Sequence, residues 1–328
     1  MQKTIVYIVE KPPIARELSP YFLLKYPSDN IYIIPTLYIG LYQFNYPRGL
    51  KHTDMPFIGT PKWKPRIFEH FPNPVFEIQS NGKSVFKKSR KTPKEILNMA
   101  DQIVFAADPD QSGVLAFHTL LKECLGEANA VMKRDALLLH TLAPKALQHT
   151  VNYPSNTLDD WFIHARNCGL AKSFFDYNFN TNSLILFGEI LRKYGVNTNN
   201  FIMSKYTLQV LYDLLNNSAK NEDYLKKMSS GWVGTGRYAK GQIGSVASRH
   251  AIIENLLANR LIKTIDGMFH VTPLGQVFLE SLHPDCQDAD LPFRINEWML
   301  TWPDSQPKIE RYIKTFFGKQ KRFADKSS

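Results

Sequence analysis

A short apolar run that ends in an acidic turn constrains the fold of this chain more than any other stretch. Residues 103–107 (IVFAA) have the composition of a buried strand. Pro109 ends that strand, because proline has no amide hydrogen and a fixed φ. Asp108 and Asp110 flank the proline, and a glycine and an apolar helix follow. The two carboxylates are therefore expected on a turn at the carboxyl end of a strand, where open α/β sheets bind their ligands.

Two carboxylates with this spacing suit a hard divalent cation such as Mg²⁺, which takes oxygen ligands and keeps several waters. A solvated Asp-Pro-Asp turn that binds nothing is the alternative. A second apolar run, residues 4–9 (TIVYIV), ends in the same way. Glu10 follows it, and Pro12 and Pro13 then open a helix of apolar period. Acidic residues thus follow two predicted strands.

The two acidic segments together resemble a known family. Glu10-Lys-Pro-x-x-Ala-Arg16 resembles the opening motif of type IA DNA topoisomerases, most closely the topoisomerase III branch. In that family the same domain, called Toprim, continues to Asp-x-Asp-Arg-Glu-Gly, which Asp108-Pro-Asp-Gln-Ser-Gly resembles. The resemblance implies that Glu10, Asp108 and Asp110 hold Mg²⁺. It also implies that these acids and Lys11 form the catalytic set if activity remains, and that Lys11 and Arg16 contact DNA.

The expected fold class is α/β: a Toprim domain with a Rossmann-like, mostly parallel sheet, followed by a helical segment and a winged-helix-like domain. Short strands alternate with helices over the first part of the chain, which favours a parallel sheet. A polar stretch at 152–159 suits a domain boundary. The predicted divisions are 1–150 for the Toprim domain, 151–205 for the helical segment, 206–290 for the winged-helix-like DNA-binding domain and 291–328 for a basic C-terminal tail.

Two further blocks carry the resemblance. Ala171-Lys172-x-x-x-Asp176-Tyr, with Asn182 beyond it, resembles a family helix in which arginine stands in place of Lys172. The segment 241–253 (GQIGSVASRHAII) resembles a family Gly-Ile-Gly-Thr-Pro-Ala-Thr-Arg segment, and a helix, two short strands and a helix are expected after it. That layout can place a helix against a nucleic-acid groove.

The family resemblance implies phosphate contacts from Lys172. Ser248 and Arg249 are expected to be exposed at a helix start, either contacting phosphates there or contacting nothing. The residues 35–74 form a long loop rich in proline, glycine and aromatic side chains, and loops of that length are usually functional. Its aromatic rings either stack on bases or only fix the loop.

The cleavage chemistry of the family is missing. Type IA topoisomerases cut DNA with a tyrosine that attacks the phosphodiester and stays bound to it. The resemblance aligns that position with Ala219, which has no hydroxyl, and Ser112 stands in place of a motif acid. The chain is also about half the typical family length, so the gate domain that lets a strand through is not expected.

Composition sets outer bounds on the function. The 328 residues carry a net charge of +10, which is compatible with a polyanion partner but also with a merely basic protein. No apolar run reaches the length of a membrane span. The three cysteines (Cys124, Cys168 and Cys286) form neither a disulfide framework nor a zinc pattern, which favours a cytoplasmic setting.

Several functions remain open from the sequence. The first is a topoisomerase III-like protein that binds DNA, single-stranded in preference, without strand passage of its own. The second is a Mg²⁺-dependent DNA nuclease or nickase that uses the Toprim acids. The third is a covalent transesterase with an unrecognised tyrosine, for which the candidates are Tyr206, Tyr212, Tyr224 and Tyr238. A structural or interaction role without nucleic acid, and a protein partner that supplies missing parts, are also open.

Overall fold

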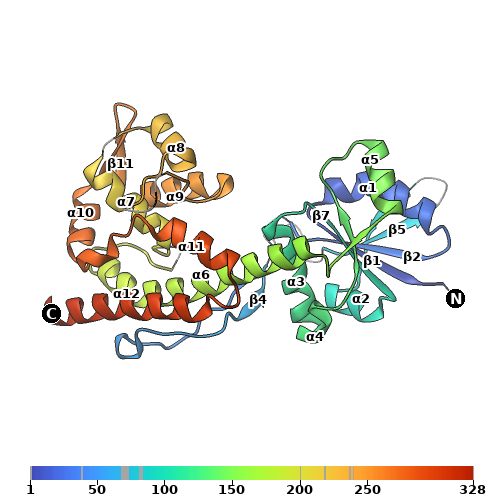
Figure 1. Ribbon diagram of the computed structural model, residues 1–328, viewed down its shortest axis with the longest axis horizontal. Helices are drawn as coiled ribbons and strands as arrows, with labels where there is room; N and C mark the ends of the chain where they lie inside the picture. Colours follow the sequence, from blue (N-terminus) through green and yellow to red (C-terminus); the bar gives the residue numbers. More distant parts are fainter. Residues whose placement is uncertain are drawn as a thin grey trace. The chain divides into compact units, whose positions relative to one another are not determined.

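The computed structural model describes residues 2–37, 40–67, 74–80, 84–199, 201–217, 219–235, 238 and 240–327. The chain divides into two compact units. The first comprises Met1–Asn45 and Lys62–Leu170, and the second comprises Tyr46–Pro61 and Ala171–Ser328. The division falls within one helix, α6 (Asp160–Lys193) (Figure 1). The segment 46–61, which was expected to belong to a loop of the first domain, therefore belongs to the second unit.

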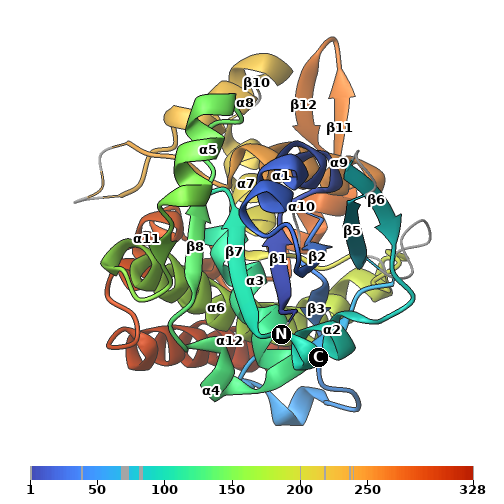
Figure 2. The ribbon, with the colours of Figure 1, turned by 90° about the vertical axis from the view of Figure 1, so that its right-hand side faces the viewer.

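A mostly parallel sheet forms the centre of the first unit, as predicted. Its strand order is β6-β5-β2-β1-β7-β8-β9 among the described residues, and Figure 2 shows β8, β7, β1, β2, β5 and β6 side by side. The four strands β2, β1, β7 and β8 are parallel. Towards the edges, β5 pairs antiparallel with β2, β6 pairs antiparallel with β5, and β9 pairs antiparallel with β8. The strand bounds are β1 Thr4–Val9, β2 Asn30–Pro35, β5 Phe76–Ser80, β6 Ser84–Lys88, β7 Gln102–Ala107, β8 Asp135–Leu138 and β9 Ser155–Asn156.

Helices cover both faces of this sheet, which explains why its central strands read as unbroken apolar runs. Successive side chains of a strand point to opposite faces. In β1, Val6 and Ile8 pack with α2 (Pro93–Met99) and α3 (Gln111–Leu125), whereas Ile5, Tyr7 and Val9 pack with α1 (Pro12–Lys25) and α5 (Pro144–Asn152). A short helix, α4 (Glu127–Ala130), follows α3.

Antiparallel strand pairs also form in segments for which no strand was predicted. Within the proline-rich segment, β3 (Tyr42–Phe44) pairs with β4 (Trp63–Pro65). Between them lies a short 3₁₀ turn, η1 (His52–Asp54). Further along, residues 84–88 form the edge strand β6, on which Lys87 and Lys88 are exposed. Positive charge on an edge strand also discourages pairing with another chain.

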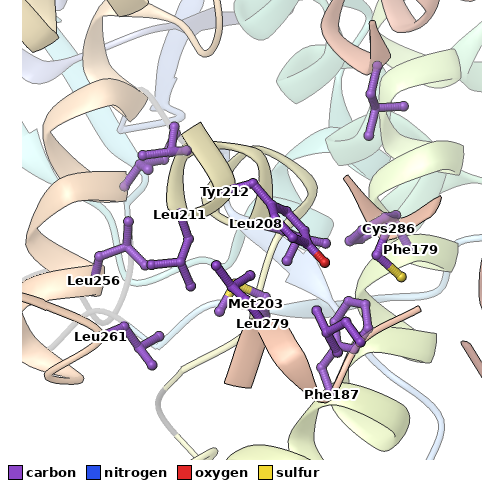
Figure 3. Packing of buried hydrophobic residues seen from close by; sticks show 14 of the residues in the cluster. Phe179, Phe187, Met203, Leu208, Leu211, Tyr212, Leu256, Leu261, Leu279 and Cys286 are labelled. Atoms are coloured by element: carbon purple, nitrogen blue, oxygen red, sulfur yellow. The ribbon is translucent and has the colours of Figure 1, made fainter. Parts of the chain in front are cut away.

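The second unit is mainly helical around one apolar cluster (Figure 3). A small sheet of order β10-β12-β11 accompanies the helices. The elements expected after residue 241 are present in the predicted order: α9, β11, β12 and α10. The bounds are α7 Lys205–Asn216, β10 Ala219–Lys220, α8 Asn221–Ser230, α9 Val246–Ala258, β11 Ile262–Ile265, β12 Met268–Val271, α10 Pro273–Glu280, η2 Pro284–Cys286, α11 Leu291–Leu300 and α12 Gln306–Ser327. The likeness of this layout to a winged helix stays a prediction.

Thr272 starts α10 as expected. Its hydroxyl oxygen accepts a hydrogen bond from the Gly275 amide at 3.1 Å, and Pro273 occupies the first helical position. Gly275 is required by a close approach, because a Cβ there would lie 2.3 Å from the carbonyl oxygen of Leu261.

Residues 291–328, predicted as a basic C-terminal tail with a helix over 308–328, are packed into the second unit. They form α11 and α12, and Ile313 and Phe317 of α12 are fully buried in the apolar cluster of the second unit. Apolar residues at helical spacing lie between the lysines of this segment, and their burial accounts for the packing of α12.

Two buried asparagines of α6 hold the segment 46–61 in the second unit. Asn182 accepts from the amide of Phe57 at 2.8 Å and donates to its carbonyl oxygen at 2.7 Å. Asn178, one turn earlier, makes the same pair with Gly59, at 2.7 and 3.0 Å. Both asparagine side chains are fully buried. They therefore bind the segment as a neighbouring strand would, through alternate backbone groups.

Candidate functional site

The acidic residues of the first unit meet at the carboxyl ends of two neighbouring parallel strands. Glu10 follows β1 and Asp108 follows β7, and these strands pair in parallel with Val9 opposite Ala106. The chain leaves β1 into α1 on one face of the sheet and leaves β7 into α3 on the other. Such a reversal is the topological switch point at which open α/β sheets bind ligands. We call Glu10, Asp108 and Asp110 the acidic switch-point site.

Local sequence fixes the two loops of this site. Asp110 is the N-cap of α3: its Oδ1 accepts from the Gly113 amide at 2.7 Å. A Cβ on Gly113 would lie 3.0 Å from the carbonyl oxygen of Asp108, so a larger residue there would push the turn apart. On the other strand, Lys11 is the extended N-cap residue of α1, and the two prolines after it start the helix.

The environment of this site raises the pKa of Glu10. Partial burial is the largest cause of a rise in the pKa of Glu10, from 4.5 to about 7, followed by the charge of Asp108 and a hydrogen bond with its side chain. The charge of Lys11 lowers the pKa and that of Asp110 raises it further. Glu10 is half-buried, whereas Asp108 and Asp110 are exposed. The site therefore concentrates negative charge that a proton or a cation can offset.

The donor set agrees with Mg²⁺, since all three side chains offer carboxylate oxygens. Across the part of the chain that the structure describes, no group of three or more His, Cys, Asp or Glu side chains is arranged closely enough to hold a metal ion. The side chains of Glu10 and Asp108 are close enough to share a hydrogen bond, whereas one carboxylate oxygen of Asp110 already accepts the hydrogen bond that caps α3. A divalent cation at this site would thus be held by two protein carboxylates with water in its other positions, as is common for Mg²⁺.

The remaining predicted DNA-contact residues fall in both units. Lys11 and Arg16 belong to the first unit, where Lys11 is half-buried beside Glu10 and Arg16 is exposed on the first turns of α1. Lys172, Ser248 and Arg249 belong to the second unit. The contacts of all five with DNA stay predictions.

Lys172 forms part of a cluster that the sequence did not reveal. Its Nζ donates to Asp176 at 2.7 Å, and Lys205 of α7 donates to the other oxygen of the same carboxylate. Lys205 is buried and also lies over the ring of Tyr206, with Nζ 4.5 Å from the centroid. Desolvation lowers the pKa of Lys172, although its side chain is 48% exposed to solvent. Burial, and then the charge of Lys172, lower the pKa of Lys205. Two amines thus share one carboxylate.

The expectation that Arg249 is exposed was wrong. Arg249 is 7% exposed, and its guanidinium donates to the carbonyl oxygen of Ile243 and to Oε1 of Gln242 at 3.3 and 3.0 Å. It anchors the loop before α9 from inside. Ser248 is half-exposed and forms a capping box with Ser245, in which each side chain accepts from the other residue's amide.

The candidate tyrosines differ in access. Tyr224 is fully buried and donates to Asp213 at 2.9 Å, and Tyr212 is 7% exposed within the core of the second unit (Figure 3). Tyr206 and Tyr238 are half-buried, and the ring of Tyr238 stacks on Phe293. Burial raises the pKa of the Tyr206, Tyr212 and Tyr224 hydroxyls. Each of these three is therefore a weaker nucleophile than a free tyrosine at neutral pH.

Comparisons with known proteins found a weak structural similarity and no match in sequence. No protein-family model matches this chain, and no curated protein matches it. Among solved structures, the chain is similar to full-length topoisomerase I from Thermotoga maritima, with 11% identity and a TM-score of 0.39. The match covers 75% of this chain and 37% of that one, so this chain spans much less than the length of that enzyme. Values this low establish neither a shared fold nor a shared activity. No helix among the described residues is long and apolar enough to cross a membrane.

Proposed function

We propose that this chain is a topoisomerase III-like protein that binds single-stranded DNA at the acidic switch-point site with Mg²⁺, and that it does not pass strands on its own. One observation carries the proposal: Glu10 and Asp108 end adjacent parallel strands at the point where the sheet topology reverses. That position is where a ligand would enter an open α/β sheet. The resemblance of the two acidic segments to the Toprim motifs then suggests which ligand it is.

Charge explains why a cation belongs in the proposal. A phosphodiester is anionic and would be repelled by the acidic site alone. Glu10 and Asp108 would hold Mg²⁺, which would supply the positive charge that a phosphate group needs at this site. Lys11 and Arg16, at the start of α1, supply positive charge on the same strand end. The net charge of +10 adds a general attraction for a polyanion.

The lack of strand passage follows from the cleavage position. The residue aligned with the family nucleophile is Ala219, which begins the short strand β10 and has no oxygen to attack phosphorus. Of the other candidates, Tyr212 and Tyr224 lie in the core of the second unit. A covalent route would need Tyr206 or Tyr238 instead.

A Mg²⁺-dependent nuclease is the second candidate, and the same pair of carboxylates favours it. Glu10 and Asp108 would hold Mg²⁺, whose chemistry would be the activation of a water molecule, so that hydrolysis would need no tyrosine. Binding and hydrolysis use the same acids, so only the fate of the DNA separates the two functions.

The test is an incubation of the protein with Mg²⁺, supercoiled plasmid and a labelled single-stranded oligonucleotide, analysed with and without protease. Asp108→Asn is the site variant. Asp101→Asn is the matched control. Asp101 lies just before the amino end of β7, where its carboxylate accepts a hydrogen bond from the amide of Thr4 at 2.7 Å. It is therefore at the end of β1 and β7 that lies opposite the acidic switch-point site.

We expect a retarded single-strand complex, unchanged plasmid, and weaker Mg²⁺-dependent retardation for Asp108→Asn but not for Asp101→Asn. DNA cut without attached protein would establish the nuclease instead. DNA that migrates normally only after protease would show a covalent tyrosine. Relaxation of the plasmid would overturn the proposal. So would a retarded complex that forms equally well without Mg²⁺ and with the Asp108→Asn variant.

A further inference from the structure

A pocket of about 280 Å³ lies in the first unit between the β3–β4 ribbon and α3. The ribbon contributes Tyr42 and Trp63, and Arg66 follows it; α3 contributes Ser112, Leu115 and Ala116. Sites for drug-sized ligands occupy roughly 300–1,000 Å³. This pocket is smaller, which suits a single ring system rather than a larger molecule.

The ring-bearing walls of the pocket are fixed by their neighbours. Trp63 packs on Phe44, with ring centroids 4.6 Å apart, and remains half-exposed. The hydroxyl of Tyr42 lies 3.4 Å from Sγ of Cys124, which holds that ring against α3. Aromatic side chains that are held in place and still partly open to solvent are suited to stacking on another flat ring.

Arg66 brings positive charge to the same pocket in a fixed position. Its Nε donates to the carbonyl oxygen of Tyr42 at 3.0 Å, and its backbone amide donates to Leu41 at 2.9 Å. These bonds hold the guanidinium beside the aromatic walls. Arginine there can donate hydrogen bonds to a base edge or attract a phosphate.

The pocket adjoins the acidic switch-point site through α3. Ser112 lines the pocket and lies two residues after Asp110, the N-cap of the same helix. Successive nucleotides of a single strand can therefore reach the acids and the pocket together. The acids require a cation to receive a phosphate, whereas the pocket offers apolar rings and one arginine.

We propose that this pocket binds one unstacked base of a single-stranded DNA chain, with Trp63 as the stacking residue and Arg66 beside it. The inference rests on the proposed function, because it places a neighbouring phosphate of the same strand at the acidic switch-point site. Stacking on an aromatic side chain tolerates any base, so the pocket confers affinity for single strands without sequence preference.

The test compares two short ligands in Mg²⁺: a fluorescein-labelled thymidine pentanucleotide and a pentamer of the same backbone in which every position is abasic. Because every position of the second ligand is abasic, no register of that strand can place a base in the pocket. Fluorescence anisotropy gives both affinities for the wild type, Trp63→Leu and Trp63→Phe. Trp161→Phe is the control, since Trp161 lies in the same unit and packs on Phe162 away from the pocket.

The wild type and Trp161→Phe should bind the pentanucleotide about tenfold more tightly than the abasic pentamer, within the range expected for one stacked base. Trp63→Leu should bind both ligands equally, at the wild-type affinity for the abasic one, and Trp63→Phe should keep most of the preference. Equal binding of both ligands by the wild type, or a preference that survives in Trp63→Leu, would overturn the pocket alone. Failure of the wild type to bind either ligand would overturn the proposed function and the pocket with it.

Discussion

Replacement of Asn182 by alanine should loosen the segment 46–61 from the second unit and destabilise that unit. The asparagine is fully buried on α6 and uses both ends of its amide on one residue, Phe57. Alanine removes the acceptor of the Phe57 amide and the donor to the Phe57 carbonyl oxygen at once. The backbone groups of Phe57 would then have to find water or remain unpaired.

The magnitude follows from these two bonds. Each neutral hydrogen bond contributes about 1 kcal/mol net, and a donor left unpaired costs about 1–3 kcal/mol more. Phe57 is half-buried, so water can satisfy part of its backbone. Asn182→Ala should therefore lower the free energy of unfolding by about 2–3 kcal/mol. Asn182→Asp should cost more, because it buries a charge and turns the donor to Phe57 into a repelling acceptor.

Asn180 on the same helix is the matched control. Its amide donates one bond, to the Tyr46 hydroxyl at 3.0 Å, and the side chain is half-buried. Asn180→Ala should cost about 1 kcal/mol or less. Urea denaturation followed by tryptophan fluorescence measures both, with circular dichroism as a second probe of cooperativity. If Asn182→Ala and Asn180→Ala cost the same, or Asn182→Asp is tolerated as well as Asn182→Ala, the strand-like role of Asn182 is refuted.

Three further predictions concern charged groups. In metal-free protein, Glu10→Gln should raise the melting temperature at pH 8 and leave it unchanged near pH 4. The pKa of Glu10 is raised from 4.5 to about 7 in the folded protein. The stability that the protonated Glu10 side chain contributes is therefore complete below pH 4.5 and is lost as the pH rises through 7. Melting curves in a chelator check this, and a variant less stable than wild type at pH 8 would contradict it. Asp176→Asn should lower the free energy of unfolding by about 3 kcal/mol, measured by urea denaturation, because two amines lose the carboxylate that they share. Lys205→Met should lower it by less, since Asp176 stays paired with Lys172. A larger loss for Lys205→Met than for Asp176→Asn would be evidence against the shared carboxylate. Arg249→Ala should lower the unfolding free energy by about 1.5–3 kcal/mol without changing the single-strand affinity of the folded protein, and lost affinity at unchanged stability would instead reveal a phosphate contact.

Short-range patterns in the sequence were sufficient for most elements of the first unit. The apolar runs at 4–9 and 103–107 predicted β1 and β7, because a strand buried on both faces has no polar alternation. Proline and glycine then marked where each strand had to end. The antiparallel strands β5 and β6 were not predicted. The strand β5 (FEIQS) is short and largely polar, and the edge strand β6 ends in two exposed lysines, so neither has the apolar signal of a buried strand.

The acidic switch-point site, too, could be predicted in part from local sequence patterns. The sequence alone placed Glu10, Asp108 and Asp110 at strand ends, because each follows an apolar run directly. That Glu10 and Asp108 face each other required the strand order, in which β7 pairs with β1 after some hundred residues of intervening chain. Strand order is decided by the packing of helices on both faces, which no local pattern records.

The sequence by itself determined the central strands of the first unit, the helices that follow them and the acids that end β1 and β7, since these depend on residues a few positions apart. Only the tertiary structure decided which of those groups are accessible and which are paired. Arg249 was read as an exposed contact and is buried, and Lys205 carried no signal and proved to share Asp176 with Lys172. The physical reason is that burial and ion pairing depend on contacts between elements distant in sequence, which form only when the whole unit packs.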